Sequence, residues 1–441
     1  MKNILPLILL SAAGNVALAA DDDLAKRVDA LEMAGYSSTL KWSGFMENRY
    51  DQYTRKESGQ KDVRLNISSN LVGIDFSSSP LPNVTIFGRL TYSNVYNNQG
   101  GTTVSNSEGR RYNSTLASFE RLFLNYKVIE GLTLSAGRLP TLDGPPSHIY
   151  DGLPRQGSYP RQVYSTPLDG YAATYSYAFS QTQSLSARLV YTPLSQIDIA
   201  NNASGEKTYN KNDVPGSTAL QNSQVPLSSW MLDYNLTGSA IARDITAIYQ
   251  GFQFKDYKAS ETWKFDYRVD AIYLEVQDIA SIGLTAYASH IQTKFVNEGG
   301  LNIPIPGNPV IGGVGKAGEL DATVKGKATI MGVHYQLPVE ALKNPALGYE
   351  THSADKNSIL FDFAARDPMA FYTQRGKGSH VYYSQPLNQA MKLRIGLMQT
   401  KPEYSRGYPV VINPATNTFQ FEPTKVDFKE TSVYASLRTD F

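Results

Sequence analysis

Arginine recurs at one parity of short alternating segments near both ends of the chain. The guanidinium group stays charged at any physiological pH, so these residues are fixed cations. If the segments are neighbouring strands of one closed sheet, the six side chains lie on one wall and favour small anions over cations. Glu47, Asp51 and Glu430 share that wall, and we expect ion pairs to neutralise part of the charge. The six residues are Arg49, Arg64, Arg89, Arg121, Arg394 and Arg438.

A second group of polar side chains lies in residues 139–168, which have neither a helical nor an alternating period. This segment holds six prolines and three glycines. Structureless stretches of this length are uncommon in compact folds and are usually functional or disordered. The segment combines both signs of charge with aromatic side chains that could pack against a neighbouring element. The candidate residues are Asp143, His148, Tyr150, Asp151, Arg155, Tyr159 and Arg161.

Catalytic, cofactor and metal chemistry find little support in the sequence. The chain has no cysteine, which excludes thiolate nucleophiles and thiolate metal ligands. Its five histidines show no zinc-type spacing. Residues 313–318 match G-x-G-x-x-G, but prolines precede them and a strand pattern follows, whereas a dinucleotide site needs a strand before and a helix after. We therefore expect no enzyme, no metal site and no cofactor.

The charge balance bears on possible partners. Lysine and arginine total 41 against 40 aspartate and glutamate residues. A nucleic-acid-binding protein usually carries a basic excess, and this chain carries none. We expect no nucleic-acid partner.

The elements that must position these residues are strands with one apolar and one polar face. Val84 to Ser93 and Arg121 to Val128 alternate in this way. Connections between such segments alternate short and long, as periplasmic turns and outer loops do in outer-membrane barrels. We predict an all-β fold, a transmembrane antiparallel β-barrel of about 16 strands, with 14 or 18 left open. The spans are 40–52, 62–76, 84–94, 115–128, 132–138, 169–178, 184–192, 228–236, 243–253, 265–277, 282–292, 323–337, 346–352, 379–385, 391–401 and 426–441.

The beginning of the chain has a different pattern. A lysine, an apolar run and a small-residue cleavage site predict a secretory signal peptide at residues 1–19. Residues 20–36 have apolar positions at the spacing of a coiled-coil seam. They fit either a short periplasmic helix on the rim of the barrel or a helix that associates in a trimer. Residues 37–441 are assigned to the barrel.

The strands, the loops and a last strand pattern that ends in Phe441 resemble bacterial outer-membrane porins over the whole chain. The segment SAGRLPTLDGPPSHIYDGLPRQGSYP more narrowly resembles a family of porins of unknown substrate. In that family a Gly-Arg-x-Pro segment, here Gly137, Arg138 and Pro140, ends a strand before a proline-rich loop. The resemblance implies passive diffusion and recognition of Phe441 by the barrel-assembly machinery.

The same resemblance gives residues 139–168 a position. They form the third predicted outer loop, after 53–61 and 95–114. In trimeric porins the third outer loop folds inward and narrows the channel. The resemblance therefore implies a constriction loop whose charges face the arginines and filter ions, and it implies a homotrimer. A loop that only caps the outside of the barrel fits the same sequence.

These observations lead to one main function and three alternatives. We expect an outer-membrane porin that lets small hydrophilic solutes or ions diffuse passively, with a weak preference for anions, in contact with outer-membrane lipid. A substrate-selective channel of the same fold is the first alternative. A surface adhesin or receptor that uses loops 193–227 and 293–322 is the second, and an outer-membrane enzyme is the third.

Overall fold

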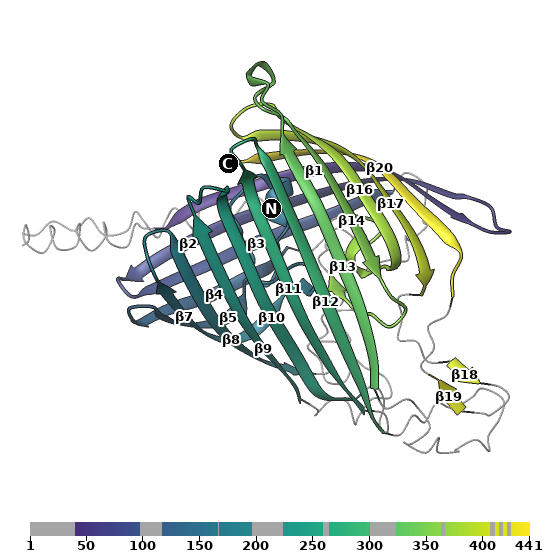
Figure 1. The fold of residues 1–441 in the computed structure, drawn as a ribbon, viewed down its shortest axis with the longest axis horizontal. Helices are drawn as coiled ribbons and strands as arrows, with labels where there is room; N and C mark the ends of the chain where they lie inside the picture. Colours follow the sequence, from purple (N-terminus) through teal and green to yellow (C-terminus); the bar gives the residue numbers. More distant parts are fainter. Residues whose placement is uncertain are drawn as a thin grey trace, which may run out of the picture.

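The structure, a computed structural model, describes residues 40–97, 117–165, 167–195, 224–258, 264–299, 323–362, 367–405, 411–413, 418–420 and 425–441. In this part of the chain, sixteen antiparallel strands form one closed barrel (Figure 1). Each strand pairs with its neighbours in chain order, and the last pairs with the first.

The barrel strands are β1 (Lys41–Glu57), β2 (Val63–Leu81), β3 (Val84–Asn97), β4 (Ser118–Ile129), β5 (Leu132–Leu139), β7 (Leu168–Ala178), β8 (Gln183–Ser195), β9 (Gln224–Thr237), β10 (Ala242–Lys258), β11 (Lys264–Ile279), β12 (Leu284–Gly299), β13 (Thr323–Gln336), β14 (Ala346–Ala354), β16 (Arg375–Pro386), β17 (Met391–Tyr404) and β20 (Phe428–Asp440).

Short elements lie in the connections. They are the helix α3 (Ser147–Asp151), the 3-10 helices η1 (Glu340–Leu342) and η2 (Phe371–Thr373), and two small sheets. One sheet pairs β6 (Tyr164–Ser165) with β15 (Phe361–Asp362) in parallel, and the other pairs β18 (Val411–Asn413) with β19 (Thr418–Gln420). Among the described residues, no helix has the length and apolar character needed to cross a membrane.

The prediction of an all-β barrel with 16 strands is confirmed. Each predicted span overlaps one barrel strand, including the short thirteenth one, which is β14. The observed strands are often longer at the end where the long loops begin, as in β1, which continues to Glu57. The predicted signal peptide and N-terminal helix lie outside the described residues.

Alternation explains why these segments form a wall. In β1 the odd-numbered Glu47, Arg49 and Asp51 are buried inside the barrel, while the even-numbered Trp42 and Met46 are exposed outside. An apolar outer face and a polar interior reverse the order of a soluble protein, because lipid surrounds the wall. Closing the sheet also leaves no strand edge with unpaired backbone groups, which hydrocarbon would not tolerate.

Glycines let large aromatic rings lie flat on the inner wall. Tyr287 faces Gly332 directly across β12 and β13, and Tyr382 faces Gly348 across β16 and β14. A Cβ atom at Gly332 would lie 2.2 Å from the Tyr287 ring, and one at Gly348 would lie 2.0 Å from the Tyr382 ring. Any larger residue would push these rings away from the wall, so the glycines fix where the tyrosine hydroxyls point.

Candidate functional site

Five of the six candidate arginines face the lumen. They lie on β17, β20, β1, β3 and β4, which with β2 form six consecutive strands of the barrel. Their side chains are between 1% and 12% exposed. The alternation that made these positions polar in the sequence therefore turns them to one inner wall. They are Arg49, Arg89, Arg121, Arg394 and Arg438.

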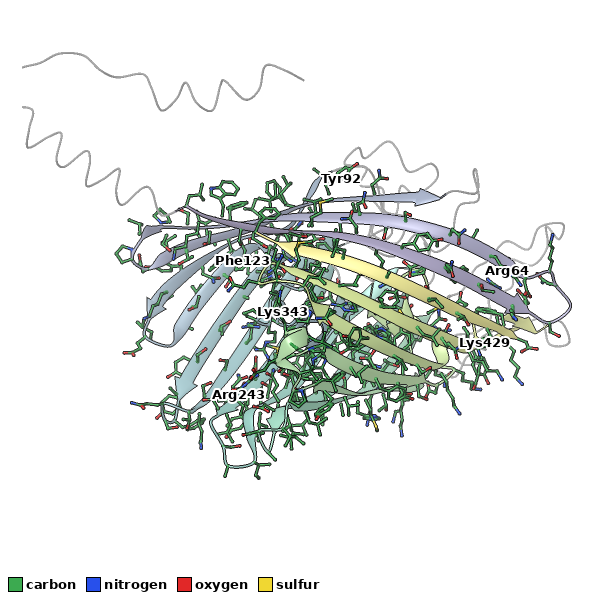
Figure 2. The ribbon with its side chains drawn as sticks, turned by 90° about the horizontal axis from the view of Figure 1, so that it is seen from above. Arg64, Tyr92, Phe123, Arg243, Lys343 and Lys429 are labelled. Atoms are coloured by element: carbon green, nitrogen blue, oxygen red, sulfur yellow. The ribbon has the colours of Figure 1, made fainter. Side chains whose placement is uncertain are left out.

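Arg64 is not part of this wall, and its prediction was wrong. It lies at the outward parity of β2, its side chain is 74% exposed, and its partner is Asp62 at 3.5 Å. Figure 2 shows Arg64 at one end of the wall, near Lys429. The reason is that this end of β2 reverses the usual pattern, with Leu65 and Ile67 buried inside and polar residues outside.

The segment 139–168 enters the barrel and contacts strands from several sides. Its Asp143 accepts a hydrogen bond from Arg89 Nη1 on β3 at 3.0 Å. Its Asp151 accepts one from Arg394 Nη2 on β17 at 2.9 Å. On another side, Arg155 forms an ion pair with Asp233 of β9. The structure thus brings the candidate loop residues to the candidate wall residues.

At Asp143 two arginines lie near one carboxylate, and only Arg89 is within hydrogen-bond distance of it. Arg89 binds both oxygens of Asp75 at 2.7 Å and also reaches Asp143. Arg121 faces Arg89 directly across β3 and β4. Its Nη2 lies 3.8 Å from Asp143, and within the described residues its Nε and Nη2 make no hydrogen bond. Arg121 is therefore a buried cation with unused hydrogen-bonding capacity.

Around Asp151 the cations also bind other acceptors. Arg394 also donates to the backbone oxygen of Tyr150 at 2.8 Å, and Lys392 donates to the backbone oxygen of Asp151. Arg438 lies 3.8 Å from Asp151 but holds Asp440 at 2.7 Å. The expected neutralisation by wall carboxylates occurs at Arg49, which pairs with Asp51 at 2.7 Å and stacks on the Tyr434 ring at 3.8 Å.

Tyr150 is the centre of a hydrogen-bonded cluster. Its hydroxyl donates to Glu350 of β14 and contacts the hydroxyl of Tyr372. Tyr287 and Tyr372 also donate to Glu350, at 2.8 and 3.1 Å. Burial, followed by the charge of Glu350, raises the pKa of Tyr150 well above its usual value. The phenol therefore stays protonated and acts as a donor that fixes the loop to the wall.

The remaining loop candidates also have partners. His148 Nε2 lies 2.9 Å from Glu275 of β11, and the Arg161 guanidinium lies 4.9 Å from the Tyr372 ring centre. Tyr159 is buried and packs in an apolar cluster with Phe123, among others. These contacts anchor the segment inside the barrel, whereas a cap on the outside would not reach the same strands.

Sequence reasoning missed a second segment that enters the lumen. Residues 367–374, between β14 and β16, are all buried, although the whole connection was expected to be an outer loop. Gln374 Nε2 donates to Glu430 Oε2 at 3.0 Å, and Tyr372 reaches Glu350. The run Met369 to Tyr372 could have indicated this, because a solvated loop has no use for four consecutive apolar or aromatic residues.

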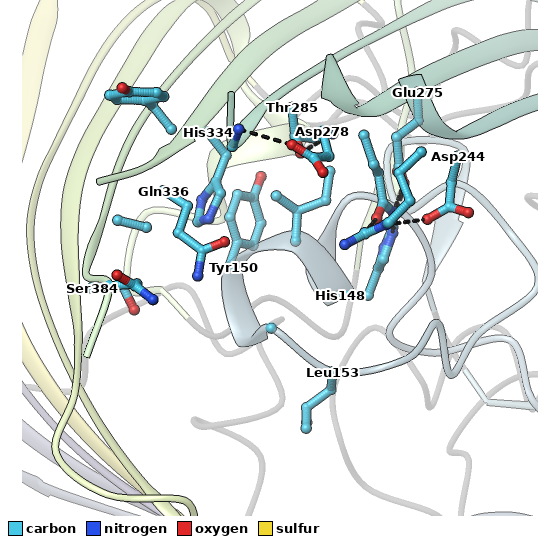
Figure 3. A pocket seen from close by; sticks show the side chains of 18 of the residues that line it. His148, Tyr150, Leu153, Asp244, Glu275, Asp278, Thr285, His334, Gln336 and Ser384 are labelled. Atoms are coloured by element: carbon cyan, nitrogen blue, oxygen red, sulfur yellow. Dashed lines mark hydrogen bonds and ion pairs between the residues drawn. The ribbon is translucent and has the colours of Figure 1, made fainter. Parts of the chain in front are cut away.

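The space left in the lumen is very uneven. A cavity of 1370 Å³ opens at the end with the short turns, and residues His148 to Arg155 form one of its sides (Figure 3). Its opposite lining includes His334, Gln336 and Ser384. Among the described residues, one space between the loop and the arginine wall measures 40 Å³, and one beside Arg89 measures 10 Å³. These spaces hold a few waters at most.

This arrangement can orient and filter small polar solutes, since cations and carboxylates face each other across a narrow passage. In the described part of the chain, no group of three or more His, Asp or Glu residues could hold a metal ion. Ser147 and His148 are adjacent in sequence, but His148 is engaged with Glu275.

A closed sixteen-stranded barrel with an apolar outer face and a charged lumen narrowed by inserted loops defines an outer-membrane protein of the porin type. The chain belongs to a family of proteins of unknown function, DUF3373, whose sequence profile matches residues 64–441. The comparison with curated protein sequences finds no match.

Solved structures show the same fold. OprB of Pseudomonas putida, solved at high pH, is similar with a TM-score of 0.51 and 9% identity, covering 94% of this chain and 96% of its own. An anion-selective porin from Comamonas acidovorans has a TM-score of 0.50 and 11% identity, covering 91% and 99%. At these identities the similarity concerns the fold alone.

Proposed function

We propose that the protein is an outer-membrane porin through which small hydrophilic solutes diffuse passively, with a weak preference for anions. The observation that carries this proposal is the inserted segment 139–168, which places Asp143 and Asp151 against an arginine wall inside a closed barrel. Arg121 supports the anion preference because it keeps two buried nitrogens without hydrogen bonds among the described residues. The other ion pairs keep the preference weak.

Single-channel recording of the purified full chain in planar lipid bilayers tests the proposal. We expect stable conductance steps and, under a salt gradient, a zero-current potential of the sign given by an anion-favouring pore. Arg121→Gln removes the least compensated cation and is expected to shift that potential toward cations. Barrels that insert but do not conduct would overturn the porin function, and an unchanged potential in Arg121→Gln would overturn the role of this arginine.

A substrate-selective channel is the second candidate. The 40 Å³ space beside Arg394 and Tyr150 favours it, because a solute larger than water must displace part of the inserted segments to pass. Conductance that is low in simple salt and is blocked by one class of sugar or anion at millimolar concentration would support selectivity. Equal passage of unrelated solutes in a liposome-swelling assay would support a general porin instead. A function as an enzyme, adhesin or receptor has no comparable observation behind it.

We further propose that residues 1–19 direct export, that residues 20–36 form a periplasmic helix, and that the barrel is a homotrimer assembled in the outer membrane through recognition of Phe441. Deleting residues 21–33 tests the helix. Loosened trimers in unheated gels are expected if the helix associates between subunits, and unaltered migration indicates a helix that rests on the barrel.

A further inference from the structure

The outer face of the barrel carries lysines that repeat at one distance from the apolar band. On four strands, a lysine lies four residues from the last apolar outward residue, toward the long loops, with one neutral polar outward residue between them. The three-residue sets are Met331, Thr329 and Lys327 on β13; Val381, Ser379 and Lys377 on β16; Leu397, Gln399 and Lys401 on β17; and Val433, Thr431 and Lys429 on β20.

This repeat places the lysine charges at one distance from the apolar band, measured along the barrel axis. Four residues of strand span about 13 Å, and the tilt of the strands reduces this to about 10 Å along the barrel axis. The lysines lie toward the strand ends from which the long loops leave, as Figure 2 shows for Lys429. Polar headgroups begin just outside the hydrocarbon. The lysines therefore lie at the headgroup level of the outer leaflet.

Three pairs of these lysines face each other directly across neighbouring strands. The pairs are Lys294 with Lys325, Lys377 with Lys401, and Lys56 with Lys429. All six side chains are exposed. Like charges directly opposite each other destabilise a sheet. With Lys327, these residues form an arc from β12 to β1, to which β14, between β13 and β16, contributes no lysine. We call it the lysine arc.

None of the ammonium groups of the lysine arc forms an ion pair with the described residues. Exposed carboxylates lie nearby at Glu403, at Asp427 and at Asp355, whose Oδ2 accepts a hydrogen bond from the backbone N–H of Lys327 at 2.9 Å. On other strands, outward arginines are paired. Arg138 binds Asp169 at 2.7 Å, and Arg268 binds Asp270 at 2.7 Å. The lysines of the arc thus differ from these arginines in having no ion-pair partner among the described residues.

We propose that the lysine arc binds the phosphate groups of anionic lipid headgroups in the outer leaflet. Phosphates bridging two facing ammonium groups remove the repulsion within each pair, and attraction of lysines to an anionic membrane surface adds to the effect. Lysine suits this task because it offers a compact charge on a flexible stem that reaches along the membrane surface.

The test counts lipids bound to the intact barrel. The purified full chain in a neutral maltoside detergent is titrated with phosphatidic acid or phosphatidylcholine, and bound lipid is measured by native mass spectrometry. Two double variants, Lys377→Gln with Lys401→Gln and Lys56→Gln with Lys429→Gln, each remove one facing pair. The matched control, Lys41→Gln with Lys127→Gln, removes two exposed lysines near the turn end.

We expect both arc variants to bind phosphatidic acid about thirtyfold more weakly, because each variant loses two lysines near an anionic surface. The control variant should bind as the unchanged protein does, and phosphatidylcholine should bind weakly to all. Arginine in place of each lysine pair should retain the binding, which separates lost charge from a folding defect.

Three results would overturn the proposal. One is unchanged phosphatidic acid binding in both arc variants. Another is an equal loss in the control variant. The third is displacement of the lipid by inorganic phosphate at the same concentration, which would assign the arc to a free anion.

Discussion

The inner and outer faces of the same strands differ in whether their cations have ion-pair partners. β1 carries Arg49 inside and Lys56 outside, and β20 carries Arg438 inside and Lys429 outside. Inside, Arg49 and Arg438 each bind a carboxylate at 2.7 Å. Outside, each ammonium group faces another one. The difference follows from the surroundings, because a buried charge must be paired, whereas an exposed lysine stays hydrated or meets a charge from outside the protein.

The largest effect is expected from breaking a buried pair inside. Arg89→Ala leaves Asp75 and Asp143 without their shared cation, and we expect a loss of about 3 kcal/mol in the free energy of unfolding. Urea unfolding in detergent, followed by heat-modifiable migration on gels, measures it. The matched change outside, Arg268→Ala, breaks the exposed pair with Asp270 and should cost less than about 1 kcal/mol. Equal losses in the free energy of unfolding would contradict the stronger contribution expected from the ion pair inside the barrel.

A smaller effect is expected from changing the charge of the inserted loop. Asp151→Asn removes the carboxylate between Arg394 and Arg438 but keeps a hydrogen-bond acceptor for Arg394. The inner cations are then less compensated, and we expect the zero-current potential to shift toward anions. Asp270→Asn on the outer face is the control and should leave the potential unchanged. A shift toward cations in Asp151→Asn would contradict the proposed field.

The smallest effect on folding stability is expected from raising the pH. Because burial raises the pKa of Tyr150, the unfolded chain loses this proton first, near pH 10, and folding becomes less favourable as the pH rises further. Between pH 9 and 11 the unchanged protein should lose up to about 1.4 kcal/mol more than Tyr150→Phe. Parallel unfolding curves at the two pH values provide the measurement, and identical losses in both proteins would exclude this contribution.

Local sequence patterns predict the strands of the barrel wall. The alternation of apolar and polar residues predicts all sixteen strands, since lipid outside and water inside impose period two on every one. The same rule fails at Arg64, because the end of β2 beyond the apolar band is polar outside and apolar inside. The alternation shows which residues share a face of a strand. Only the position of the membrane along the strand determines whether the outer face is apolar.

The contacts in the lumen follow from no local pattern. Tyr150 and Glu350 are 200 residues apart, and neither one's sequence neighbourhood points to the other. Strand counting placed residues 139–168 as the third outer loop and so gave a reason to expect them inside. Strand counting gave no such reason for residues 367–374, because their burial depends on the space that residues 139–168 leave in the lumen.

The short parallel pairing of β6 with β15 has a mechanical consequence. β6 belongs to the loop between β5 and β7, the fifth and sixth strands around the barrel, and β15 to the loop between β14 and β16, the thirteenth and fourteenth. These strand pairs lie half a circumference apart. The two loops thus connect opposite sides of the barrel through its interior, and this connection resists flattening of the wall.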